Sequence, residues 1–176
     1  NIMSCIRSVI KAITQEDDQP LNILTFLNNE WYDTNLAQLN HNFYFWRKGF
    51  PTEWNENLCK MPENCFSLFS DDLPLAVDFN FIIVNDRTNQ FGIGKQISRF
   101  LHLPILSMHH TGRHALVQHP KWSVIANSIG DTSVYSSEKI RDDWEDAGYG
   151  MVINTTGRNF SETKAIAELL RKDFDR

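Results

Sequence analysis

Five short segments of this 176-residue chain carry the side chains best suited to chemistry, and each follows an apolar run. They are rich in Asn, Asp, His, Thr and Glu, and they span residues 28–33, 85–89, 107–112, 136–138 and 154–157. Such groups hydrogen-bond hydroxyls or take up a proton. A simpler interpretation is that loops at strand ends are polar because they meet water. The set as a whole favours a ligand site more than any single residue does.

A glycine pair beside a lysine, Gly92-Ile93-Gly94-Lys95-Gln96, raises the question of a phosphate-binding loop. A Walker A loop needs glycine five residues before the Gly-Lys glycine, where Asn89 stands, and Ser or Thr after the lysine, where Gln96 stands. The dinucleotide fingerprint also fails, because Ile97 replaces its third glycine. Close packing of a helix against a neighbour explains the glycines better.

Four histidines between residues 109 and 119 raise the question of a metal ion. His110 and His114 have the spacing of a helical pair, but Thr111-Gly112 between them is poor helix. No acidic or thiolate ligand lies nearby at a suitable spacing. We therefore expect no metal and no cofactor. The sequence also holds no Gly-x-Ser-x-Gly motif and no cysteine in the context of a nucleophile.

The apolar runs predict the elements that position these segments. Residues 79–84 and 103–108 are short apolar runs typical of buried strands. Between them, residues 90–102 have apolar side chains three and four apart, which predicts a helix. Strand, helix and strand in about 30 residues form a βαβ unit, and such units build parallel sheets with right-handed crossovers.

Further elements complete the prediction. We expect strands at residues 21–27, 41–46, 66–69, 133–135 and 151–153. We expect helices at residues 2–13, at 35–39 with Thr34 as N-cap, at 113–118 as a single turn, from a cap at Ser136 or Ser137 through Ala147 to Gly148, and at 165–170. This series predicts an α/β, doubly wound, Rossmann-like domain with a mainly parallel sheet at residues 21–160. An N-terminal helix and turn (1–20) and a C-terminal helix (161–176) flank it.

Composition narrows the class of protein. A hydrophobic content of 41% and an aromatic content of 12% are those of a globular protein with one core. The net charge of −5, with no basic stripe, argues against a nucleic-acid partner. Three cysteines without a repeated spacing indicate reduced thiols, and no signal peptide or membrane-spanning segment is evident. We therefore expect a cytoplasmic protein without an integral membrane segment.

Three groups of motifs occur in a suggestive order and spacing. They are Leu21-Asn22-Ile23-Leu24-Thr25-Phe26 with Asn29-Glu30-Trp31-Tyr32, Gln90-Phe91 opening a helix that ends Leu101-His102-Leu103-Pro104, and Ser107-Met108-His109-His110-Thr111. The run from Val134 through Ser137-Glu138 to Trp144, followed by Gly148-Tyr149 and Val152-Ile153-Asn154, continues the pattern. Over residues 21–154 the chain resembles the N-terminal half of GT-B glycosyltransferases of the retaining group 1 type, found in bacteria and their phages.

The resemblance implies an enzyme that transfers a sugar from a nucleotide-sugar donor to a sugar or protein acceptor. This domain would hold the acceptor, and a second Rossmann-like domain or chain would hold the donor nucleotide. The resemblance assigns roles to eight residues: His110 as the catalytic residue facing the donor sugar with His109 and Thr111 beside it, Glu30 and Tyr32 on the acceptor side, and Asn85, Asp86 and Gln90 on the cleft floor.

The chain also departs from the family. It has no second domain, and the acidic C-terminal motif and the basic nucleotide-binding residues of the family are absent. After Asn154, residues 155–158 lead to a short helix instead of an interdomain linker. Two interpretations stay open: a glycosyltransferase-like domain completed by a second domain or chain, and a non-catalytic binding or assembly module on a Rossmann-like scaffold. The polar strand-end segments favour the first, and the missing half favours the second.

Overall fold

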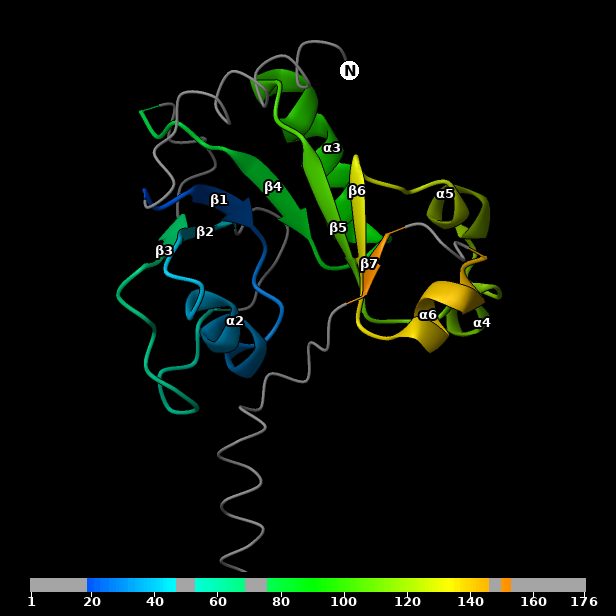
Figure 1. Cartoon of the computed structure of the whole chain (residues 1–176), viewed down its shortest axis with the longest axis horizontal. Coiled ribbons are helices and arrows are strands. Elements are labelled where there is room, and N and C mark those ends of the chain that lie inside the picture. The colour runs from blue at the N-terminus through cyan, green and yellow to red at the C-terminus, as the bar shows by residue number, and fades with distance from the viewer. Residues whose placement is uncertain (1–18, 47–52, 69–75, 146–149, 153–176) are drawn as a thin grey trace, which may run out of the picture.

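A computed structural model of the chain describes residues 19–46, 53–68, 76–145 and 150–152 (Figure 1). The strands are β1 (Asn22–Thr25), β2 (Asn42–Trp46), β3 (Cys65–Leu68), β4 (Phe81–Val84), β5 (Ile105–His109), β6 (Thr132–Tyr135) and β7 (Met151–Val152). They form one seven-stranded sheet in the order β3-β2-β1-β4-β5-β6-β7, and every pairing is parallel. The prediction of an α/β, Rossmann-like domain is confirmed.

Five helices connect these strands in the described ranges. They are α2 (Glu30–Ala37), α3 (Asn89–Leu101), α4 (Arg113–Leu116), α5 (Trp122–Ala126) and α6 (Glu138–Asp143). Figure 1 shows α4, α5 and α6 gathered beside β6 and β7. The helices expected at residues 2–13 and 165–170 lie outside the described residues.

Both faces of the sheet are covered, which is why its central strands are rich in apolar residues. Leu24, Ile82 and Val84 pack with side chains of α3 in one core cluster. Their neighbours Ile23 and Ile83 belong to a second cluster that includes Ala37 of α2. Neighbouring side chains of a strand point to opposite faces, so α3 and α2 cover different sides of the sheet. Burial of each large aliphatic side chain contributes about 1.5–3 kcal/mol.

A third, smaller core lies under α4, α5 and α6. Tyr135 at the end of β6 is fully buried there, together with Ile125 and Trp144. Trp144 stacks on Trp122, with 5.8 Å between the ring centroids. This cluster attaches the last helices to the carboxyl end of the sheet, where a ligand would bind.

The start of α2 differs from the prediction of a loop at residues 28–33 and a helix at 35–39. The helix begins at Glu30, because the Asn29 side chain caps it by accepting a hydrogen bond of 2.8 Å from the Tyr32 N–H. Asn is among the best N-cap residues, and acidic residues in the first turn suit the positive end of the helix dipole. Thr34 lies inside the helix, where its hydroxyl contacts the Cys59 thiol.

The predicted cap of α6 is confirmed at Ser137, whose hydroxyl accepts from the Ile140 N–H at 3.3 Å. The predicted end of this helix is wrong. It stops at Asp143, because Glu145 has a φ of 61°, in the left-handed region that helical residues avoid.

The two glycines of α3 serve different purposes. A Cβ on Gly94 would come within 2.7 Å of Val84 Cγ1, so this glycine lets α3 lie directly on β4. A Cβ on Gly92 would meet nothing within 4 Å. The prediction that close packing explains the glycines holds for Gly94 and is wrong for Gly92.

Candidate functional site

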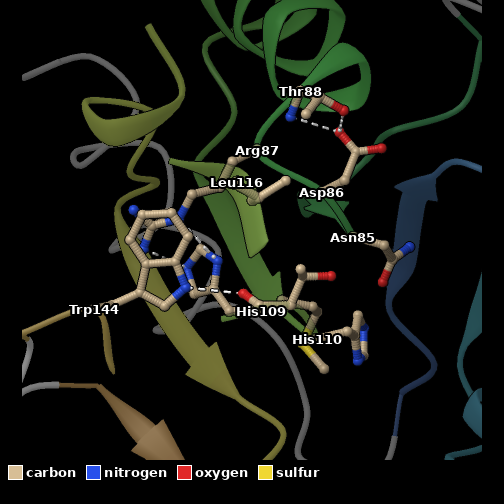
Figure 2. A pocket seen from close by; sticks show the side chains of 10 residues that line it. Asn85, Asp86, Arg87, Thr88, His109, His110, Leu116 and Trp144 are labelled. Atoms are coloured by element: carbon tan, nitrogen blue, oxygen red, sulfur yellow. Dashed lines mark hydrogen bonds between the residues drawn. The ribbon is translucent and has the colours of Figure 1, made fainter. Parts of the chain in front are cut away.

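The order of the strands fixes where a ligand can bind. From β1 the chain proceeds to β2 and β3 on one side, and then returns to place β4 on the other side of β1. In open α/β sheets, ligands bind beyond the carboxyl ends of the strands at such a reversal. A pocket of about 190 Å³ lies next to this position, after β4 and β5 (Figure 2). It is lined by Asn85, Asp86, Arg87, Thr88, Met108, His109, His110, Thr111, Leu116 and Trp144.

Asn85 is the first residue after β4, and its side chain is buried with only 6% of its surface exposed. Its backbone N–H donates to the Gln90 side-chain oxygen at 2.8 Å. Within the described ranges, neither the oxygen nor the nitrogen of the Asn85 side-chain amide has a hydrogen-bond partner. A buried amide without a partner costs roughly 1–3 kcal/mol. The wall of the pocket therefore holds an unsatisfied polar group, whose oxygen and nitrogen have almost no solvent-accessible surface in this structure.

His110 follows β5 and lies on the same side of the pocket as Asn85 (Figure 2). Its ring meets the ring of Tyr32 edge to face, with 5.0 Å between the centroids. Burial lowers the pKa of His110, so its imidazole is neutral near pH 7. Burial also raises the pKa of Tyr32, and its buried hydroxyl has no hydrogen-bond partner in the described part of the chain. Helix α2 thus places the Tyr32 ring against His110, in the loop that follows β5.

A second layer of side chains supports the opposite side of the pocket. The buried Arg87 donates from Nε to His109 Nδ1 at 3.1 Å, and its guanidinium carbon lies 3.6 Å from the centroid of the Trp144 ring. His109 Nε2 lies 3.3 Å from the Ser133 hydroxyl. Because Nδ1 accepts from Arg87, the proton of His109 belongs on Nε2, where it can reach Ser133. Burial and the Arg87 charge lower the pKa of His109 to about 3, so this ring stays neutral.

Trp144 ties this layer to the rim of the pocket. Its Nε1–H donates to the Thr111 carbonyl at 2.9 Å while its ring covers Arg87. Figure 2 shows Trp144 on the side of the pocket away from Asn85 and His110. Helix α6 thereby holds the loop that carries His110.

The structure brings together most of the residues expected to form a site. Those that line the pocket are Asn85, Asp86, His109, His110 and Thr111, and Tyr32 joins them through its contact with His110. Asp86 also caps α3, because its Oδ1 accepts from the N–H groups of Thr88 and Gln90.

Two of the expected residues do not line the pocket. The Gln90 side chain is buried beneath it and holds the Asn85 backbone. Glu30 lies at the start of α2, where its carboxylate accepts from the Asn55 N–H at 2.9 Å.

Sequence reasoning did not single out Arg87 or Trp144. Arg87 stands inside the polar segment 85–89, but a charged side chain in a loop is ordinarily expected in solvent. Trp144 follows α6 at the edge of the third core, and nothing in its local sequence points to a strand-end loop. Both are recognised only from contacts made across the fold.

Two further properties concern the described residues as a whole. No three His, Cys, Asp or Glu side chains gather there in a way that could hold a metal ion. Within the same ranges, no helix combines the length and the apolar character needed to cross a membrane.

Comparison with known proteins adds no relative from which a role could be transferred. No protein-family model, no curated protein and no solved structure matches this chain.

Proposed function

We propose that this chain is the acceptor-side domain of a glycosyltransferase, which transfers a sugar from a nucleotide-sugar donor when a second domain or chain completes the cleft. The observation that carries the proposal is that Asn85 and His110 line one pocket after β4 and β5, where Tyr32, which follows β1, contacts His110. A carboxamide, a neutral imidazole and a neutral phenol can each donate or accept a hydrogen bond, as sugar hydroxyls can.

The size of the pocket supports a division of labour between two domains. Its volume of about 190 Å³ is below the range of roughly 300–1,000 Å³ that encloses a drug-sized ligand. It suits one sugar ring and is too small for a whole nucleotide sugar. A second domain or chain would therefore hold the donor nucleotide, as the resemblance to GT-B enzymes implies.

His110 is the residue that we expect to contact the reacting sugar. Its neutral ring can hydrogen-bond a hydroxyl, and the Tyr32 ring fixes its orientation. Retaining transfer does not require this histidine to act as a base. Orientation alone accounts for large rate effects when the reacting groups are held in a productive geometry.

The test is a transfer assay on the complete protein, or on this domain joined to its partner, with mass spectrometry of the products. We expect His110→Ala to reduce transfer by roughly tenfold or more, because loss of one orienting hydrogen bond of about 1.4 kcal/mol has that effect. The melting temperature should fall by no more than roughly 4 °C, the shift caused by about 1 kcal/mol in a domain of this size.

His119→Ala is the matched control, because this histidine is exposed and its Nδ1 accepts from the Lys121 N–H at 3.1 Å. It should leave transfer unchanged. An unfolded His110→Ala protein would identify a structural histidine. Absence of transfer with every donor and acceptor would favour the binding or assembly module instead.

A further inference from the structure

The buried amide of Asn85 limits what can enter the pocket. Its backbone is held by Gln90 and by the end of β4, so the side chain has a fixed origin. The amide carries an oxygen acceptor and two N–H donors, and none of these is satisfied within the described ranges. Because both polar atoms are buried, the side chain must rotate toward the open space to present them to a ligand. A matching ligand must present a donor and an acceptor side by side. Two adjacent hydroxyl groups do so.

The charges around the pocket favour a neutral ligand. His109 and His110 have lowered pKa values and Tyr32 has a raised one, so all three are uncharged near pH 7. The carboxylate of Asp86 is directed to the N-terminus of α3. The guanidinium of Arg87 lies against Trp144 and His109. Asp86 and Arg87 carry opposite charges and line the same pocket, so neither sign of ligand is favoured, and a charged ligand would also lose hydration.

We infer that the pocket binds a single uncharged sugar ring and that Asn85 selects it by pairing with two adjacent hydroxyls. This inference rests on the proposed function and deepens it, because it names the chemical class of the acceptor. It makes Asn85 a specificity-determining residue. The sugar would displace the few waters that a space of about 190 Å³ can hold.

The experiment is saturation-transfer NMR on the full chain with methyl glycosides of common hexoses, a hexuronic acid, a hexose 6-phosphate and a capped asparagine peptide. We expect at least one neutral glycoside to bind, and the two charged sugars to bind at least tenfold more weakly. Asn85→Leu should weaken glycoside binding at least tenfold. The matched variant Asn127→Leu, at an exposed asparagine that follows α5, should bind as the wild type does.

A second readout separates recognition from structure. Replacement of an unsatisfied buried amide by an apolar group of similar size removes a desolvation cost, so Asn85→Leu should melt at or above the wild-type temperature. A lower melting temperature, unaltered glycoside binding, preferential binding of a charged sugar or of the peptide, or no binding of any neutral glycoside would each overturn the inference.

The same experiments distinguish this inference from the proposed function. If neutral glycosides bind through Asn85 but the complete protein transfers no sugar, the inference stands and the glycosyltransferase proposal falls. If the complete protein transfers sugar to an acidic acceptor, the glycosyltransferase proposal stands and the inference falls.

Discussion

The carboxyl group of Asp33 lies in the first half of α2, next to Tyr32, and only 1% of the residue is exposed. Its Oδ2 accepts from the Asn28 N–H at 2.9 Å, and its Oδ1 has no hydrogen-bond partner among the described residues. Burial raises the pKa of Asp33 to about 7, compared with about 3.9 for an exposed aspartate. The folded state therefore holds this proton more tightly than the unfolded state does. The stabilisation that this protonated carboxyl gives the folded state is fully present below about pH 4, and it is lost as the pH rises through 7.

Asp33→Asn tests this titration. The amide oxygen can still accept from Asn28, but the side chain cannot ionise, so the variant should be more stable than the wild type at pH 8 and equally stable at pH 4. Because one pKa unit corresponds to about 1.4 kcal/mol, the gain at pH 8 should reach a few kcal/mol. Thermal unfolding at both pH values measures it. Equal shifts at the two pH values would show that the charge of Asp33 is not responsible.

At the same scale, the sequence predicted some site residues and not others. Asn85 and His110 were predicted because each stands directly after a strand whose apolar run is unmistakable. The burial of Asp33 and Arg87 was not predictable. It depends on contacts made across the fold, such as that of the Trp144 ring with Arg87, whereas charged residues in local sequence are expected in solvent.

At the scale of elements, the contact between α3 and β4 depends on one glycine. Gly94→Ala should destabilise the protein by roughly 1–3 kcal/mol, because the added methyl must displace Val84 Cγ1 from 2.7 Å. Val84 is fully buried and β-branched, so its side chain has little freedom to move aside. Denaturant unfolding of the variant measures the loss.

Gly92→Ala provides the matched comparison two residues earlier in the same helix. This position is exposed and has open space for a methyl group, so alanine should stabilise α3 by roughly 0.5–1 kcal/mol. We expect Gly94→Ala to lower the free energy of unfolding and Gly92→Ala to raise it. A gain at Gly94 would mean that α3 is not held against β4 in the way described.

The positions of the strands and helices could be predicted wherever a single pattern in the sequence was dominant. The central strands were predicted because both of their faces are buried, which leaves runs that are largely apolar. The start of α2 was missed because Asn29 and Thr34 are both good caps, and only the hydrogen bond to Tyr32 decides between them. The end of α6 was missed because the backbone turns at Glu145, a residue without the sequence signature of a helix stop.

At the scale of the whole molecule, the proposed division between two domains predicts weak donor binding. The isolated chain should bind uridine, guanosine and adenosine diphospho-sugars more weakly than micromolar. Half a cleft supplies only part of the contacts and desolvation that affinity requires. Isothermal titration calorimetry across this panel measures the affinity. Micromolar binding by the chain alone would contradict the proposal and indicate a complete site within one domain.

The class of fold was predictable at this scale, but the order of the strands was not. A βαβ unit identifies β4 and β5 as parallel neighbours from local sequence alone. The placement of β4 beside β1 depends on pairings between distant segments, such as Leu24 with Ile82. No local pattern encodes that choice, although it places α2, which follows β1, where Tyr32 contacts His110.

The pairing of β1 with β4 also has a consequence in time. Strand β1 precedes the other described strands of the sheet in the chain, and β2 and β3 leave the ribosome before its second neighbour, β4, does. At about 5–20 residues per second, one edge of β1 stays open for several seconds of synthesis. Parallel strands cannot close as local hairpins, so β4 cannot pair with that edge until its own segment has been made. The middle of the sheet closes only after β4 has emerged, and the pocket, which needs the loop after β5, forms later still.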